Sequence, residues 1–279
     1  MRKSARTAAK WYRKAAAQGE LRAIYQLGIL HESGRGVPRD YQAAARWYLK
    51  AAEGGDPKAQ AKLGILMSEG HWIPKNGVEK KAVKWVRRVA NTGLPSALNT
   101  MGLMYAKGLS VQKNGKIAAR WYRRAANQGY AKAQVNLGFL HYHGNGIPRD
   151  YEKALFWFRK AAEGGDPNAQ TLYGLMLTSD HLGYRNYEEA VKWYRRAAQK
   201  GYVEAKFQLG FMYANARGVE KDFGEASKWY TKAAQKDHSQ AQLNLGFMYE
   251  KGRGVAKSFY QAAKWYQKAA RRGHGEAQL

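Results

Sequence analysis

Apolar residues recur along the chain with one dominant spacing. Eight of the nine tryptophans stand 36 residues apart, with a single interval of 38, at positions 11, 47, 85, 121, 157, 193, 229 and 265. A glycine repeats in phase with them at positions 28, 64, 102, 138, 174, 210 and 246. Two such series in phase indicate a tandem repeat of about 36 residues.

Each period contains two stretches with helical spacing. The first, helix A, is centred on the repeated glycine and carries large apolar residues directly after it, as in Gly246-Phe247-Met248-Tyr249. Apolar positions that recur every three or four residues predict an amphipathic helix. Because a glycine inside a helix costs about 1 kcal/mol relative to alanine, its recurrence predicts that another helix backbone passes close by.

The second stretch, helix B, is centred on the tryptophan, which is flanked by alanines and is expected to join the apolar stripe. Seven residues before the tryptophan the sequence has N-cap residues in seven of eight cases: Ser4, Asp40, Asn114, Asp150, Asn186, Asp222 and Ser258. Eight residues after it stands a glycine, or Asp237 in one repeat, which predicts the end of the helix.

These boundaries predict an all-α solenoid of seven complete A–B pairs, preceded by an orphan helix B, that spans residues 1–279 as a single domain. The expected repeats cover about 20–55, 56–93, 94–129, 130–165, 166–201, 202–237 and 238–273. Terminal repeats normally carry a polar cap. Neither end of this chain has one, which is compatible with a monomer and with a piece of a longer array.

The pattern resembles the Sel1-like repeat family, a relative of the tetratricopeptide repeats. The residues that carry it are, for example, Ala133-x-x-x-Leu137-Gly138, Gly144-x-Gly146-Ile147-x-x-Asp150 and Ala154-x-x-Trp157-Phe158-x-x-Ala161-Ala162-x-x-Gly165. The resemblance implies a right-handed α/α superhelix whose A helices line a concave groove, and it implies an adaptor or scaffold. Val86, Asp237 and the segment 180–183 depart from the pattern.

By the tetratricopeptide analogy, fixed positions around the helix A glycine face the groove. Lys58 and Lys62 are one helical turn apart, as are Lys132 and Asn136, and each pair resembles the carboxylate clamp of some tetratricopeptide domains. The alternative interpretation is that these are solvated helix residues. The candidate partner-binding residues are Lys58, Lys62, Ile65, Trp72, Leu103, Lys132, Asn136, Phe139 and His143.

Trp72 is the one tryptophan outside the periodic series. It stands in the longer A–B loop Gly70-His71-Trp72-Ile73-Pro74-Lys75, where the 38-residue repeat gains its two extra residues. Insertions in solenoids map to loops, often on the binding face, and an exposed tryptophan is a frequent interface anchor. Alternatively, Trp72 folds inward and fills the space that the longer loop creates.

The charge is strongly positive, with 48 Lys and Arg against 21 Asp and Glu and a formal net charge of +27. No acidic residue stands between Glu79 and Asp150. Such a field attracts acidic proteins, nucleic acid or anionic lipid. Basic residues one before and three after the helix B tryptophan share a helix face, which is expected to be either a solubilising surface or a track for an acidic or phosphate-bearing partner.

Catalytic chemistry has no candidate in the sequence. The chain has no cysteine, the histidines do not form a metal-ligand pattern, and the turn glycines lack the strand and lysine of a phosphate loop. No cofactor is expected, no apolar run is long enough for a membrane span, and no signal peptide is visible, which leaves the compartment open. The predicted function is a non-catalytic scaffold that binds an acidic partner protein or peptide; the alternatives are a bacterial immunity or inhibitor protein and a nucleic-acid or anionic-surface binder.

Overall fold

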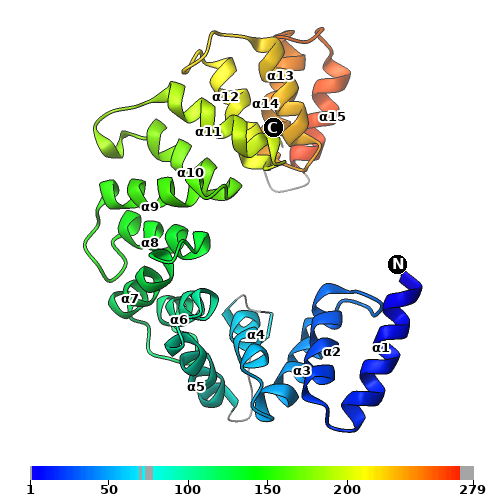
Figure 1. The fold of residues 1–279 in the computed structure, drawn as a ribbon. Coiled ribbons are helices and arrows are strands. Elements are labelled where there is room, and N and C mark those ends of the chain that lie inside the picture. Colours follow the sequence, from blue (N-terminus) through cyan, green and yellow to red (C-terminus); the bar gives the residue numbers. More distant parts are fainter. Residues whose placement is uncertain (1, 69–70, 73–77, 271–279) are drawn as a thin grey trace. The chain divides into compact units, whose positions relative to one another are not determined.

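The computed structural model describes residues 2–68, 71–72 and 78–270, and it places all regular structure of these residues in helices (Figure 1). The chain divides into two compact units, residues 1–149 and 150–279. The first unit contains α1 (Arg2–Ala17), α2 (Leu21–Ser33), α3 (Tyr41–Glu53), α4 (Pro57–Ser68), α5 (Val78–Asn91), α6 (Pro95–Lys107), α7 (Gly115–Ala126) and α8 (Ala131–His143).

The second unit contains the remaining helices and one short 3-10 turn, η1 (Asp180–Leu182). Its helices are α9 (Tyr151–Glu163), α10 (Pro167–Thr178), α11 (Tyr187–Gln199), α12 (Val203–Ala214), α13 (Phe223–Ala234), α14 (Ser239–Lys251) and α15 (Phe259–Ala270). The even-numbered helices are the predicted A helices and the odd-numbered ones the predicted B helices. Among the described residues, no helix is both long and apolar enough to cross a membrane.

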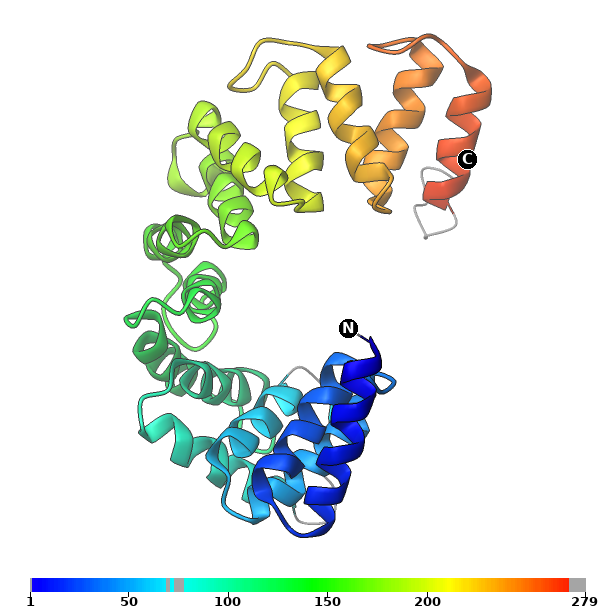
Figure 2. The same ribbon diagram turned by 45° about the vertical axis from the view of Figure 1, so that its right-hand side comes forward.

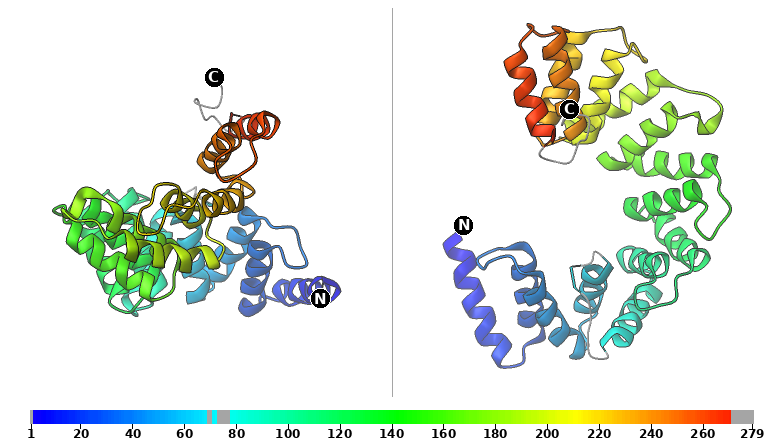
Figure 3. Two further views of the ribbon diagram at one scale, coloured as in Figure 1. Left: turned by 90° about the horizontal axis from the view of Figure 1, so that it is seen from above. Right: turned by 180° about the vertical axis from the view of Figure 1, so that it is seen from behind.

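Within each unit, every helix packs against the next one along the chain, as α1 to α3 do in Figure 2 and α13 to α15 do in Figure 3. This arrangement is an α/α solenoid, as the period predicts. Each A helix is therefore packed between the B helix before it and the B helix after it, except where a unit begins or ends.

The predicted helix ends are confirmed in nearly every repeat. The side chains of Asp40, Asn114, Asn186 and Asp222 accept hydrogen bonds from backbone N–H groups in the first turn of their B helices. The six stop glycines from Gly19 to Gly201 have positive φ, and Asp237 adopts the same left-handed conformation with φ 66°; Gly273 lies outside the described residues. Ser4 is the exception, because α1 already begins at Arg2 and Ser4 lies inside it.

The recurrent glycine of the A helices faces an aromatic ring rather than a helix backbone, which corrects the sequence-based expectation. A Cβ at Gly28 would lie 2.4 Å from the ring of Tyr48, and one at Gly210 would lie 2.6 Å from the ring of Tyr230. Gly102, Gly174 and Gly246 meet Tyr122, Tyr194 and Tyr266 in the same way, and Gly64 meets Val86. The absence of a side chain at the glycine thus leaves room for a large side chain of the following B helix to pack against it.

The B-helix residue that fills the core is the one after the tryptophan. Tyr48 and Tyr194 are fully buried, and Tyr122, Phe158 and Tyr230 are nearly so. The tryptophans themselves, expected in the apolar stripe, are mostly half-buried, and Trp11 is 64% exposed. In the second unit, Tyr230 packs into a core cluster with Ala226, Ala233, Ala241, Leu245 and Met248.

The glycine–ring contact predicts that Gly210→Ala destabilises the second unit. Alanine favours a helix by about 1 kcal/mol over glycine, but its Cβ would clash with the Tyr230 ring, and overpacking of a core costs about 1–3 kcal/mol. We expect the thermal unfolding midpoint, followed by circular dichroism, to fall. The exposed Lys264→Ala substitution in α15 is the control and should leave it unchanged; a higher midpoint for Gly210→Ala would contradict the tight contact.

The buried tyrosines predict a loss of stability at alkaline pH. Burial raises the pKa of Tyr230 and of Tyr266 to about 12, and it raises the pKa of Tyr48, Tyr122 and Tyr194 further. In the unfolded chain tyrosine ionises near pH 10. The stabilising contribution is therefore complete below pH 10 and is lost as the pH rises from about 10 towards 12. Urea unfolding from pH 8 to 11.5 measures it; a constant unfolding free energy over this range would contradict it.

Candidate functional site

An apolar residue directly follows each A-helix glycine, and none of these residues is buried. Phe139 is 37% exposed and Phe247 41% exposed, and the other members are half-buried. In contrast, the residue directly before each glycine is buried in every repeat. We call these exposed apolar residues the apolar row; its members are Ile29, Ile65, Leu103 and Phe139 in the first unit and Leu175, Phe211 and Phe247 in the second.

The apolar row contains three predicted partner-binding residues, Ile65, Leu103 and Phe139. All three are accessible on the surface of their A helices, as a binding surface requires. Phe139 stacks against the ring of His143, another candidate, at a centroid distance of 6.0 Å. These four residues therefore lie on the outside of α4, α6 and α8.

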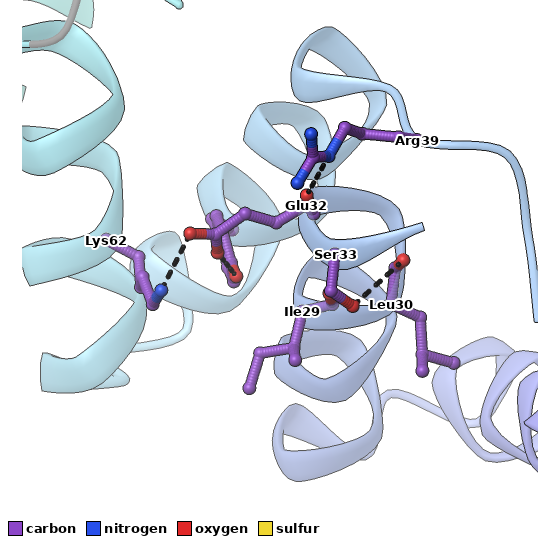
Figure 4. A network of polar contacts seen from close by, with 7 residues as sticks. Ile29, Leu30, Glu32, Ser33, Arg39 and Lys62 are labelled. Atoms are coloured by element: carbon purple, nitrogen blue, oxygen red, sulfur yellow. Dashed lines mark hydrogen bonds and ion pairs between the residues drawn. The ribbon is translucent and has the colours of Figure 1, made fainter. Parts of the chain in front are cut away.

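The lysine pair Lys58 and Lys62 is not free to act as a clamp as it stands. Lys58 is exposed, but Lys62 Nζ lies 2.8 Å from Glu32 Oε1, a carboxylate of α2 (Figure 4). The hydroxyl of the buried Tyr48 donates a hydrogen bond to the other oxygen of Glu32. A carboxylate of the chain itself thus occupies the place expected for a carboxylate of the ligand. The repeat pattern does not indicate this contact, because Glu32 and Lys62 belong to neighbouring repeats.

The second pair, Lys132 and Asn136, is also partly engaged. Asn136 Nδ2 donates to Oδ1 of the buried Asn99 at 2.9 Å. Lys132 is exposed on α8. The exposed cations of the proposed clamps are consequently Lys58 and Lys132, one from each pair.

Trp72 is 8% exposed and packs inside the first unit. The backbone N–H groups of His71 and Trp72 both donate to the carbonyl of Leu66, which turns this end of the loop back onto α4. Of the two expectations, inward packing is the one that the structure shows, and the indole is not available as an exposed anchor. The neighbouring loop residues 69, 70 and 73–77 lie outside the described part of the chain, as do residues 271–279, of which 271–273 belong to the last expected repeat.

A pocket on the A-helix side of the second unit was not predicted from the sequence. It has a volume of about 270 Å³ and lies between α12, α13 and α14. Two members of the apolar row, Phe211 and Phe247, line it together with Phe223, Lys221 and Arg253. In the sequence, the only indication of this pocket is that two consecutive members of the apolar row are phenylalanines. That Ala214 lies beside them, and leaves space there, is visible only in the structure.

The basic face of the B helices carries tryptophans that are covered by their own cations. Lys14, Arg124, Arg196, Lys232 and Lys268 lie 4.1–4.9 Å from the ring centroids of the tryptophans three residues before them. The expectation that these aromatics belong to the core holds for Trp193, which is buried, and in part for Trp265, which packs half-buried against the core cluster, whereas it is wrong for the largely exposed Trp11. Cation–π contacts of this kind contribute about 0.5–1 kcal/mol at exposed sites and occupy the ring faces on which a nucleic-acid base would stack.

The described residues contain no group of three or more His, Asp or Glu side chains that could hold a metal ion. The large pKa shifts among them belong to tyrosines, and burial is the first cause of each. Perturbed groups of this kind also occur in structural cores, so they do not by themselves mark an active site.

The Sel1 repeat model matches residues 1–20, 21–56, 57–93, 95–130, 131–166, 167–202, 203–238 and 239–274. A Sel1 repeat protein from Oxalobacter formigenes is 32% identical, with a TM-score of 0.76 over 97% of this chain and 78% of that one. A protective antigen of uropathogenic Escherichia coli strains is 31% identical, with a TM-score of 0.45 over 97% and 73%. An immunity protein from Pseudomonas aeruginosa is 18% identical, with a TM-score of 0.46 over 76% and 81%. No curated protein matches the chain.

The contact of Glu32 with Tyr48 and Lys62 predicts that Glu32→Ala destabilises the first unit. The substitution leaves the Tyr48 hydroxyl and the Lys62 ammonium without this partner, and an unsatisfied buried polar group costs about 1–3 kcal/mol. The matched control is Glu53→Ala in α3, where the carboxylate is exposed. Urea unfolding followed by circular dichroism should show a lower free energy for the first variant only. Equal free energies for both variants would mean that the Glu32 contacts do not stabilise the fold.

Proposed function

Because the chain belongs to the Sel1 repeat family, whose members are generally protein-interaction scaffolds, we propose that it is a non-catalytic adaptor that binds an acidic segment of a partner protein along the exposed faces of its A helices. The observation that carries the proposal is the apolar row. Seven apolar side chains recur at one position of the repeat, and none of them is buried in the core of its own unit.

Exposing apolar side chains to solvent is unfavourable, and a role in the core alone does not explain why this position keeps them. The position before the glycine shows that the fold can bury a large side chain there, whereas the position after it keeps isoleucine, leucine or phenylalanine in contact with solvent. Apolar side chains that stay in contact with solvent at the same position of every repeat favour an interaction site. Aromatic members such as Phe139, Phe211 and Phe247 are of the residue class that interface cores favour.

The charge beside the row determines the chemistry of the partner. Lys58 and Lys132 stand exposed at equivalent positions of α4 and α8. Lys132 lies within the acid-free segment 80–149, and Lys58 lies before it in the sequence, so the field near Lys132 in particular is cationic. Complementary charge speeds association and selects partners more than it raises affinity. An acidic partner with apolar residues between its carboxylates would match both features.

The proposal predicts that reversing the charge of Lys58 and Lys132 weakens partner capture. Lys58→Glu/Lys132→Glu changes the formal charge by four and should remove most of the partner that wild-type protein retains from a lysate of the source organism at physiological salt. Lys10→Glu/Lys84→Glu makes the same change of charge on exposed B-helix positions and is the matched control. Lys62 is left unchanged because its substitution would also break the contact with Glu32.

The read-out is the set of captured proteins compared between the three forms by mass spectrometry, with helicity checked by circular dichroism. A partner lost from the A-helix variant and kept by the B-helix variant supports the proposal. If the A-helix variant keeps the partner and the B-helix variant loses it, the proposal is contradicted, and the basic face of the B helices is the binding surface. Capture of nucleic acid rather than protein that persists at physiological salt would favour the alternative of an anionic-surface binder, whereas nucleic acid that is lost in modest salt would reflect bulk charge alone.

A further inference from the structure

The pocket of the second unit has the wall composition of a site for an apolar group that carries negative charge. Phe211 from α12, Phe223 from α13 and Phe247 from α14 form its apolar walls, and the nearly buried Tyr230 lies among them. The carboxamide of Asn244 also lines the pocket. All of these residues belong to one compact unit.

The side chains of two cations at the pocket lie over aromatic rings. Lys221 Nζ lies 5.0 Å from the ring centroid of Phe223, and Arg253 Cζ lies 5.6 Å from Phe223 and 5.4 Å from Phe247. Over the described residues, neither cation forms a salt bridge with a carboxylate of the chain. Both are exposed and can therefore turn towards an incoming anion.

The first unit shows what occupies the corresponding position in another repeat. Counted from the A-helix glycine, Ala214 corresponds to Glu32, Tyr230 to Tyr48, and Asn244 to Lys62. In the first unit the Glu32 carboxylate accepts a hydrogen bond from the Tyr48 hydroxyl and contacts the Lys62 ammonium; Figure 4 shows the contact with Lys62. In the second unit the glutamate is replaced by an alanine that lines the pocket. The missing side chain leaves space next to a tyrosine and an amide.

A further repeat places a glutamate at the same position. Glu250 follows Gly246 by the same four residues as Glu32 follows Gly28, and it accepts a hydrogen bond of 2.9 Å from the hydroxyl of Tyr266. This hydrogen bond contributes to lowering the pKa of Glu250, after the larger effect of Lys251, so the ionised form is favoured there. Two repeats thus show that the tyrosine of the following B helix, buried at Tyr48 and half-buried at Tyr266, is a suitable donor to a carboxylate at this position.

We propose that the pocket between α12, α13 and α14 binds a glutamate side chain of the partner protein, which takes the place that Glu32 fills in the first unit. The carboxylate accepts hydrogen bonds from Tyr230 and Asn244 and attracts Lys221 and Arg253, while an apolar residue next to the glutamate packs on Phe211 and Phe247. This inference rests on the proposed adaptor function and assigns it a specific subsite.

The test uses short blocked peptides and does not require the partner to be known. Acetyl-Phe-Glu-Phe-amide is titrated into the full chain while amide signals are followed by heteronuclear NMR. We expect shifts in residues 211–253 and binding about tenfold tighter than that of acetyl-Phe-Gln-Phe-amide, since a charge-assisted hydrogen bond is roughly twice as strong as a neutral one. Equal binding of the two peptides overturns the proposal.

A third peptide, acetyl-Phe-Gln-Phe with a free carboxyl terminus, separates a side-chain carboxylate from a terminal one. The proposal expects it to bind about as weakly as the blocked glutamine peptide. If it instead binds more tightly than the glutamate peptide, the pocket recognises a chain terminus and the assignment to a glutamate side chain is overturned.

Variants locate the binding. Ala214→Glu supplies the carboxylate from within the chain, as in the first unit, and should abolish binding of the glutamate peptide while the circular dichroism spectrum stays unchanged. Arg253→Gln should weaken binding several-fold, whereas Lys257→Gln, in the same loop but outside the pocket lining, should not. Undiminished binding to Ala214→Glu overturns the proposal; if that variant fails to fold, the comparison of the glutamate and glutamine peptides on the wild-type chain still decides.

The two tests fail in different ways. Loss of partner capture in the Lys58→Glu/Lys132→Glu variant concerns the first unit, and peptide binding concerns the second. If the peptides do not discriminate but capture still depends on Lys58 and Lys132, the subsite is refuted and the adaptor function stands. If the glutamate peptide binds as expected but capture is unaffected, the pocket is a carboxylate site and the proposed role of the first unit is refuted.

Discussion

The contact between a B-helix ring and an A-helix glycine is the constraint on which the rest of the structure depends. The ring occupies the space in which a side chain of the A helix would otherwise stand, and it brings the two helices together at a fixed rotation. Side chains on a helix change face within one or two residues. Once the glycine faces the ring, the residue before it is directed into the core and the residue after it towards solvent, which creates the apolar row. The same rotation brings the end of the A helix within hydrogen-bonding reach of the tyrosine hydroxyl, as Glu32 and Glu250 show.

The acidic residues of this basic chain are largely used within its own fold. Asp40, Asp56, Asp150, Asp166 and Asp222 accept hydrogen bonds from backbone N–H groups at helix starts. Glu32 is held by Tyr48 and Lys62, and Glu204 lies 3.0 Å from a ring nitrogen of His238. Since these carboxylates serve capping and contacts between repeats, few of them remain to neutralise the basic residues on the surface of the described part of the chain. A partner that supplies carboxylates would therefore complete a charge balance that the chain does not achieve alone.

The sequence was sufficient for the fold because its signals are local and repeated. Asp40 and Asn114 were identifiable as caps from their distance to the next tryptophan, and Asp237 as a helix stop from its place in the glycine series. The orientation of the B helix was not, because Trp47 and Tyr48 recur with the same period and spacing alone does not decide which of two adjacent aromatics is buried. The engagement of Lys62 by Glu32 could not be predicted either, since it joins helices of two repeats. For a related reason the sequence permits two interpretations of Trp72: the length of an inserted loop does not determine whether a tryptophan in that loop turns inward or outward.

Regular repeats make the deviations chemically informative. Glutamate in one repeat and alanine in another can occupy equivalent positions with similar surroundings. The repeat with the glutamate then shows which chemical group the repeat with the alanine can accept from a ligand. In the first unit the Glu32 carboxylate already occupies this position. A carboxylate of a partner would have to displace it, and the partner loses translational and rotational freedom on binding whereas Glu32 does not. In the second unit Ala214 removes that competitor while Tyr230, Asn244 and the two cations remain. Selectivity in such an array can therefore arise from which repeats lack their internal carboxylate, without any change in the helices that position the surrounding side chains.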